Sequence, residues 1–340
     1  MRYVVLGKSG LLVSEVSLGT MTFGRETPED ESVRILERYL EAGGNFIDTA
    51  NVYSQGISES ILGRALKGKR ENVVLATKVF FRMGDGIYDC GASRKHIMRA
   101  VEESLKRLQT DYIDLYQIHC FDSITPLEET FATLAHLVEK GYVRYVGVSN
   151  YTGWQITKTV ALCEKWGYPR PVSAQMQYSL VERNIEMEVI PACYDAGLSI
   201  MAWGPLGGGF LTGKYKPGSL PQEGRIARAE KDWEEAWDRR ATEKNFRILE
   251  TLGNLAQKYG KTVSQIALNW LLTKKDVIPI LGARTLGQLE DNLGCIGWRL
   301  EEEDVRLLDE VSAPPEIYPY RFIRWANGRV YRKEYGLRLP

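Results

Sequence analysis

Four polar side chains of different chemical types stand where short apolar runs of the chain end. Asp48, Lys78 and His119 each close such a run, and Tyr53 comes five residues after Asp48. A free phenol, with a pKa near ~10, is a poor proton donor at neutral pH, but a nearby ammonium favours the phenolate and eases proton transfer. A carboxylate, a phenol, an ammonium and an imidazole can therefore do acid–base chemistry together, provided that the fold brings them to one place.

Each of these four side chains also has an ordinary structural interpretation. Asp48 could cap the turn that follows it, and Tyr53 could pack at a rim. Lys78 could be a solvated charge at a strand end, and His119 could be a hydrogen-bonded core histidine. Their matching positions at the ends of separate strands favour a shared site over four unrelated structural roles.

The elements that must position these side chains alternate in type along the chain. Strands are predicted at 16–18, 45–48, 73–77, 112–119, 145–149, 173–177, 198–203 and 277–281. Helices are predicted at 30–42, 58–66, 93–108, 126–140, 152–166, 184–196, 241–259, 263–273 and 285–296, with Ser93 as the cap of the third. Eight strand–helix units predict an α/β fold, a (β/α)8 TIM barrel that fills residues 1–340 as a single domain.

An open dinucleotide-binding sheet is a poorer fit. Such a sheet would carry a G-x-G-x-x-G motif after its first strand, and the residues there, Gly19–Gly24, do not match it. Val4–Leu6 and Leu11–Val13 predict an N-terminal β-hairpin that closes the bottom of the barrel.

Three segments fall outside the strand–helix repeat. They are 80–92, 204–237 and the tail at 313–340, and the tail is predicted to begin as early as residue 311. Long loops in compact domains are usually functional or disordered. We therefore expect extended loops at the C-terminal face of the barrel, where barrel enzymes build their active sites.

Five motifs, each at a predicted strand end, resemble those of the aldo-keto reductase family. They are Asp48–Tyr53 with Ser58–Gly63, Ala76–Lys78, Asp114–His119, Gly147–Asn150 and Pro279–Arg284. They occur in family order, and the resemblance runs from about Tyr3 to Ser312. Within that family, the chain resembles the bacterial NADPH-dependent reductases and the related potassium-channel beta-subunit branch.

The resemblance implies an NADP(H)-dependent oxidoreductase that reduces aldehydes or ketones to alcohols by hydride transfer. Tyr53 would be the general acid, and Lys78 would favour its phenolate form. Asp48 would hold Lys78 and offset the cost of burying it. His119 would donate a hydrogen bond to the substrate oxygen. In the oxidation direction Tyr53 would act as the base.

The resemblance also implies a set of side chains that bind NADPH or NADP+. These are Gly19, Thr20, Asp48, Ser149, Asn150, Gln175, Trp203, Gly204, Leu206, Gly208, Lys214, Gly282, Arg284, Gln288 and Asn292. Trp203 stands where the family usually has a stacking tyrosine, which puts the ring geometry in doubt but not the role. The glycine loop after it would approach the pyrophosphate, or it could be a flexible loop without a ligand.

The choice of NADPH over NADH depends on the last strand–helix unit. Arg284 would bind the adenosine 2′-phosphate, and Gln288 and Asn292 would face the adenine. No acidic residue stands there for a ribose hydroxyl, as NADH binding would favour. Arg284 could instead be a solvated charge at the helix start.

The substrate pocket is open to two interpretations. Aromatic residues near the hydride could form an apolar slot or be ordinary rim packing; they are Phe80, Phe81, Tyr88, Trp237 and Trp325. Asp122 could support the site or be an exposed helix-entry charge.

Composition excludes several other classes of protein. Lys+Arg and Asp+Glu both total 44, so no global field favours nucleic acid or an anionic membrane. Five cysteines without a C-x-x-C pair indicate reduced thiols, and no apolar run suggests a signal peptide or a spanning helix. We expect a cytoplasmic protein with a small-molecule carbonyl substrate, and a homo-oligomer is possible.

Two alternatives remain open. A metal-dependent barrel hydrolase would place several histidines at strand ends, whereas His96 and His136 lie in predicted helices and no metal is expected. An accessory subunit that keeps the cofactor as a sensor, with weak turnover, is compatible with the same four side chains.

Overall fold

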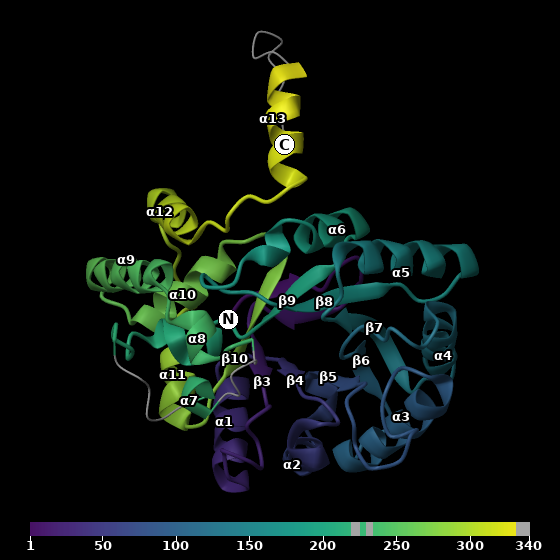
Figure 1. The fold of residues 1–340 in the computed structure, drawn as a ribbon. Helices are drawn as coiled ribbons and strands as arrows, with labels where there is room; N and C mark the ends of the chain where they lie inside the picture. Colours follow the sequence, from purple (N-terminus) through teal and green to yellow (C-terminus); the bar gives the residue numbers. More distant parts are fainter. Residues whose placement is uncertain (219–224, 229–233, 331–340) are drawn as a thin grey trace.

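Eight parallel strands form a closed barrel at the centre of the protein (Figure 1). The computed structural model describes residues 1–218, 225–228 and 234–330. The strands follow one another around the barrel in chain order, and the last closes against the first. They are β3 (Ser17–Gly19), β4 (Phe46–Asp48), β5 (Val74–Val79), β6 (Ile113–Ile118), β7 (Val143–Ser149), β8 (Pro171–Gln177), β9 (Ser199–Trp203) and β10 (Val277–Gly282). The predicted (β/α)8 barrel is confirmed.

Helices surround the barrel. They are α1 (Glu29–Glu41), α2 (Ile57–Ala65), α3 (Arg94–Leu108), α4 (Leu127–Glu139), α5 (Gly153–Trp166), α6 (Val189–Ala196), α9 (Glu243–Tyr259), α10 (Val263–Leu272) and α11 (Leu286–Leu293). Most of them bury one side, whereas α10 is buried along nearly its whole length. The side chain of Ser93 accepts a hydrogen bond from the amide of His96, which confirms it as the cap of α3.

One predicted helix is wrong over its first part. The segment predicted as a helix from 184 to 196 divides into a short 3-10 turn, η3 (Asn184–Glu186), and α6, which begins at Val189. Pro191 explains the division, because a proline is tolerated in the first turn of a helix but not in its interior. A helix that began at 184 would have placed Pro191 in that interior.

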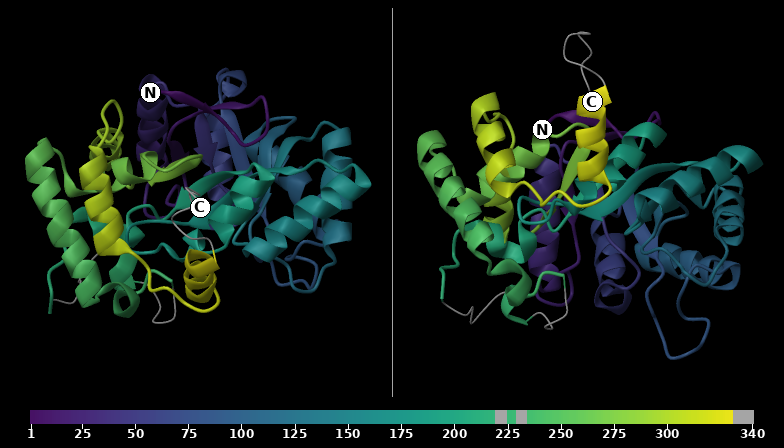
Figure 2. Two further views of the ribbon diagram at one scale, coloured as in Figure 1. Left: turned by 90° about the horizontal axis from the view of Figure 1, so that it is seen from above. Right: turned by 45° about the horizontal axis from the view of Figure 1, so that its top comes forward.

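Several further elements were not predicted. η4 (Gly207–Thr212), α7 (Arg225–Arg228) and α13 (Tyr320–Val330) lie in the segments predicted as loops or tail, and α8 (Trp237–Arg240) begins where one of them ends. α12 (Glu302–Ser312) lies largely between the last predicted helix and the tail. α12 packs against α9 through the buried side chain of Leu308. α13 projects away from the barrel in Figure 1, and Figure 2 gives two further views of it; none of its residues is buried. Its first residue, Tyr320, donates a hydrogen bond to Glu188 at the start of α6.

The predicted hairpin is present and closes the bottom of the barrel. β1 (Tyr3–Val5) pairs with β2 (Leu12–Ser14) in antiparallel fashion. Leu6, just after β1, and Val13, in β2, are fully buried and pack with the inward-facing residues at the starts of the barrel strands, such as Phe46 and Val74.

The inside of the barrel changes from apolar to polar along the strands. Because side chains alternate across a strand, Phe46 and Asp48 face the same way on β4, and so do Val74 and Lys78 on β5. The apolar members pack with the hairpin. Their polar partners come later in each strand and lie at the opposite, C-terminal end of the barrel.

The described residues contain neither a membrane-spanning helix nor a cluster of metal-binding side chains. None of their helices combines the length and the apolar character needed to cross a membrane. No group of three or more His, Cys, Asp or Glu side chains within those residues could hold a metal ion. All five cysteines are unpaired thiols.

Candidate active site

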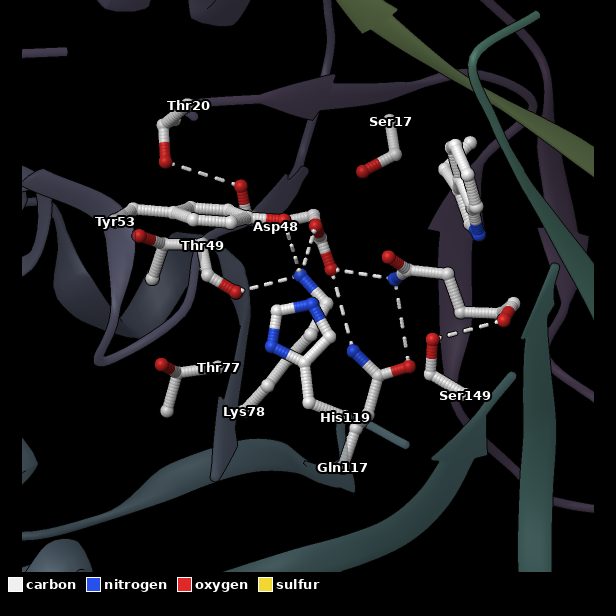
Figure 3. A network of polar contacts seen from close by, with 12 residues as sticks. Ser17, Thr20, Asp48, Thr49, Tyr53, Thr77, Lys78, Gln117, His119 and Ser149 are labelled. Atoms are coloured by element: carbon white, nitrogen blue, oxygen red, sulfur yellow. Dashed lines mark hydrogen bonds and ion pairs between the residues drawn. The ribbon is translucent and has the colours of Figure 1, made fainter. Parts of the chain in front are cut away.

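The four side chains singled out in the sequence meet at the C-terminal end of the barrel (Figure 3). The Lys78 Nζ donates to Asp48 Oδ1 at 2.6 Å and to the Tyr53 hydroxyl at 3.2 Å. Its third acceptor is the Thr49 carbonyl at 2.8 Å. Burial alone would lower the pKa of Lys78, but the Asp48 carboxylate and the Tyr53 phenol together hold that pKa above its ordinary value. The amine is therefore a buried cation beside a phenol.

The backbone after Tyr53 takes an uncommon path. Tyr53 begins the 3-10 turn η1 (Tyr53–Gly56), and Ser54 and Gln55 follow with φ of 51° and 52°. Two successive non-glycine residues in the left-handed region are costly, and such conformations cluster at functional sites. The Ser54 hydroxyl donates to the Phe23 carbonyl at 2.8 Å, which helps to hold the turn in this shape. The turn points the phenol back toward Lys78.

The ring of His119 lies next to the ring of Tyr53. Its ring makes edge contacts with the rings of Tyr53, at 5.8 Å between centroids, and of Phe81, at 4.7 Å. Burial, and then the nearby ammonium of Lys78, hold the pKa of His119 well below its usual range. The imidazole is thus neutral at neutral pH and keeps one N–H for a hydrogen bond.

Two buried amides hold the second oxygen of Asp48. Gln175 Nε2 donates to Asp48 Oδ2 at 2.8 Å, and Gln117 Nε2 donates to the same oxygen at 3.2 Å. Gln117 was missed in the sequence. Its position two residues before His119 on one strand could have revealed it, because alternate residues share a face.

The residues expected to hold the nicotinamide amide form one connected group. Asn150 Nδ2 donates to the His119 carbonyl at 2.9 Å and to Ser149 Oγ at 3.1 Å. Trp203 Nε1 donates to Asn150 Oδ1 at 3.1 Å, and Ser149 Oγ donates to the Gln175 carbonyl at 2.9 Å. The indole therefore takes its orientation from the same asparagine that is tied to the backbone of His119.

Gly19 ends the first barrel strand, where it pairs with Asp48, and Thr20 follows it. Both the amide and the hydroxyl of Thr20 donate to the Asp48 carbonyl, each at 3.0 Å. A Cβ on Gly19 would lie 2.7 Å from the Ile280 side chain, so a glycine is needed for the close packing there.

The glycine loop after Trp203 is the cradle expected for the pyrophosphate, and its backbone path requires glycine. Gly204 and Gly208 have φ of 60° and 70°, in the region that favours glycine. A Cβ on Gly204 would lie 2.6 Å from the carboxylate of Glu235, a fully buried residue. In this structure the Glu235 carboxylate therefore takes the space that a side chain at position 204 would need. Leu206 lies within the loop, and the exposed Lys214 lies just beyond it.

The predicted adenosine-binding residues lie together at the start of α11. The Arg284 amide donates to the side chain of Gln288 at 2.9 Å, and Asn292 donates to the Gly282 carbonyl at 3.0 Å. Arg284 is half-buried, and no ion pair of its guanidinium is found within the part of the chain that the structure describes. The guanidinium can therefore bind an anion at a helix start, and these residues fit a phosphate-bearing nucleotide.

The candidate substrate residues do not all lie at the site. Phe81 contacts the ring of His119, and Phe80 packs edge-on against Phe81. In contrast, Trp237 packs in a cluster with Phe210.

The other three candidates lie on loops or on the tail. Tyr88 lies under the Lys95 ammonium, and Trp325 lies on the exposed α13. Asp122 accepts hydrogen bonds from the amides of Ala92 and Ile124, which supports a role in shaping its loop.

Comparisons with known proteins agree with this geometry. The model of the family described as "Aldo/keto reductase family" matches residues 15–313. An "Uncharacterized oxidoreductase YrpG" of Bacillus subtilis is 40% identical over 327 residues, 93% of this chain and 97% of that protein. A "Probable voltage-gated potassium channel subunit beta" of Arabidopsis thaliana is 34% identical, over 87% of this chain and 91% of that protein. An "L-glyceraldehyde 3-phosphate reductase" of Escherichia coli is 34% identical, over 87% of this chain and 88% of that protein.

Proposed function

The chain belongs to the aldo/keto reductase family, and from this premise we propose that it reduces aldehyde or ketone carbonyls to alcohols with NADPH. The observation that carries the proposal is the 3.2 Å hydrogen bond between the buried Lys78 ammonium and the Tyr53 phenol. A phenol so placed can give up a proton to a carbonyl oxygen, because the adjacent cation stabilises the phenolate that remains.

Each of the four side chains has a distinct task in this proposal. Bound NADPH supplies the hydride for the carbonyl carbon. Tyr53 transfers its hydroxyl proton to the carbonyl oxygen, and solvent later restores that proton. Lys78 stays charged throughout, and Asp48 keeps the ammonium from being a lone buried charge. The neutral His119 donates its N–H to the carbonyl oxygen and orients it toward Tyr53.

The cofactor would be held by three groups of residues. Ser149, Asn150 and Gln175 would bind the nicotinamide amide, and Trp203 would cover the ring face. The cradle around Gly204, with Leu206, Gly208 and Lys214, would approach the pyrophosphate, while Gly19 and Thr20 would line the near wall. Arg284 would bind the 2′-phosphate, with Gly282, Gln288 and Asn292 around the adenosine. This arrangement favours NADPH over NADH.

A Tyr53→Phe variant tests the proposal. We expect it to lower kcat by at least about a hundredfold, the scale of positioned proton transfer, while NADPH still binds with nearly unchanged affinity. Turnover is followed by NADPH absorbance over a panel of aldehydes and ketones, with NADH run beside it. Tyr116→Phe is a matched control, because the Tyr116 hydroxyl is buried without a hydrogen-bond partner. Unchanged turnover in Tyr53→Phe would refute the assigned acid.

A second candidate is a cofactor-binding accessory subunit with weak turnover. It is favoured by the likeness to probable potassium-channel beta subunits of two plants, at 34% identity each. Native mass measurement beside the turnover assay separates the two: a tetramer without turnover supports the accessory subunit. The homo-oligomer and the cytoplasmic location stay predictions.

A further inference from the structure

Gln117 lies beneath the reacting side chains, although none of the tasks above involves it. It lies on β6 and is fully buried. Its Nε2 donates to Asp48 Oδ2 at 3.2 Å, and its Oε1 accepts from Gln175 Nε2 at 3.5 Å. Both ends of this amide are thus used within the polar network around Asp48.

The three hydrogens of the Lys78 ammonium each have one acceptor. These acceptors are Asp48 Oδ1, the Thr49 carbonyl and the Tyr53 hydroxyl. An ammonium has no fourth hydrogen. Asp48 must therefore accept only one of these three hydrogens, because a second bond to Asp48 would use the hydrogen that Lys78 donates to Tyr53. A carboxylate free to turn could offer Oδ2 as well and compete with the phenol.

We propose that Gln117 is a positioning residue that acts through Asp48. Together with Gln175 it occupies Oδ2, so that Oδ1 alone faces Lys78 and the remaining ammonium hydrogen stays on Tyr53. The proposal rests on the function proposed above, in which Tyr53 is the acid. Gln175 also has an expected place beside the nicotinamide, whereas the side-chain bonds found for Gln117 all lie within this network.

The neighbouring strand leaves room for this amide. Gln117 pairs in register with Gly147 on β7. A Cβ on Gly147 would lie 3.0 Å from Gln117 Cγ and 2.8 Å from Ser173 Oγ. Since contacts that short require a neighbour to shift, the glycine keeps Gln117 where it can reach Asp48.

A Gln117→Met variant removes the donor and keeps nearly the same length. We expect kcat to fall about tenfold, the cost of losing one buried hydrogen bond to a charged group, with the KM for NADPH within about twofold. The alkaline limb of the kcat–pH profile should move to higher pH, because a phenol with a weaker ammonium contact ionises less readily. Ser173→Ala is the matched control: it removes a buried hydroxyl without a hydrogen-bond partner from the same layer of the barrel. It should leave both quantities unchanged.

A Gln117→Glu variant gives a signature that a purely structural role would not. A glutamic acid can donate to Asp48 Oδ2 only while protonated, and the neighbouring carboxylate favours that protonated form. The ratio of its kcat to that of the wild type should therefore be lowest at alkaline pH and recover as the pH falls. The same ratio for the Ser173→Ala control should not change with pH.

A crystal structure of Gln117→Met separates this proposal from the proposed function. We expect Asp48 to turn so that both oxygens contact Lys78 Nζ, with the bond from Lys78 to Tyr53 lengthened or lost. An Asp48 that keeps its orientation, or a kcat within about twofold of the wild type, would overturn the positioning role. A wild-type protein without turnover would count against the proposed function instead, and the orientation of Asp48 would still decide the role of Gln117.

Discussion

His119 is a buried base that the fold keeps neutral. Burial and the nearby Lys78 ammonium lower its pKa well below the usual value, and burial also lowers the pKa of His96. In the unfolded chain, the imidazoles of His119 and His96 would each bind a proton as the pH falls through about 6.5. The stability that the neutral forms contribute is therefore present above that pH and is lost as the pH falls below it.

The corresponding prediction concerns the free energy of unfolding. It should decrease between pH 7.5 and pH 5.5, and the decrease should be smaller in His119→Gln, by up to about 1.4 kcal/mol per pH unit for one proton. Urea unfolding of both proteins at several pH values measures it. An equal decrease in the two proteins would show that His119 is not the group responsible.

Arg284 should determine which nicotinamide cofactor is preferred. Replacing it by alanine removes a cation at the start of α11, and we expect the KM for NADPH to rise about tenfold or more while the KM for NADH changes little. Arg38→Ala is a suitable control, since Arg38 is half-exposed and pairs with Glu290 on α11. Steady-state kinetics with both cofactors test it. A parallel rise for NADPH and NADH would place the 2′-phosphate elsewhere.

Among the elements, the N-terminal hairpin depends on a single glycine. Gly7 has φ of +55°, and a Cβ there would lie 2.1 Å from the Val172 carbonyl. A Gly7→Ala variant should therefore lose about 2 kcal/mol or more of stability, from backbone strain and a steric clash. Gly10→Ala in the same loop has nothing within 4 Å of its Cβ and serves as the control. Chemical denaturation of the two variants measures the difference, and equal stabilities would mean that the hairpin does not need this close approach.

The sequence predicted those elements whose periodicity was strong. All eight strands were found, and the four candidate side chains lie together because parallel strands of a barrel end at one face. The helix expected from 184 begins only at Val189, because Pro191 is tolerated in the first turn of a helix and not in its interior. α12 was missed in a segment for which no element was predicted.

What could not be predicted were contacts between distant parts of the chain. The link from Trp203 through Asn150 to the His119 carbonyl joins three strands, and local patterns carry no information on such contacts. The spacing from His119 could have placed Gln117 on the same face, but its hydrogen bonds to Asp48 and Gln175 could not be predicted for the same reason. Glu235 against the glycine loop likewise appears only once the chain has folded.

At the scale of the whole molecule, α13 of the tail contributes no buried side chain to the packing around the barrel. α13 buries none of its residues, whereas α12 buries Leu308 against α9. A chain that ends after residue 313 should therefore keep its Tm within about 2 °C, and one that ends after residue 300 should lose several degrees. Calorimetry of both truncations tests this. A large loss in the first would mean that α13 is held by contacts in solution, and native mass would show whether a second copy provides them.

The hairpin covers the N-terminal end of the barrel, and apolar side chains such as Leu6 and Phe46 fill the interior beneath the polar network. A ligand can therefore reach the four candidate side chains only from the C-terminal end. If the proposed cofactor binds beneath the substrate there, the substrate has to enter after it and leave before it.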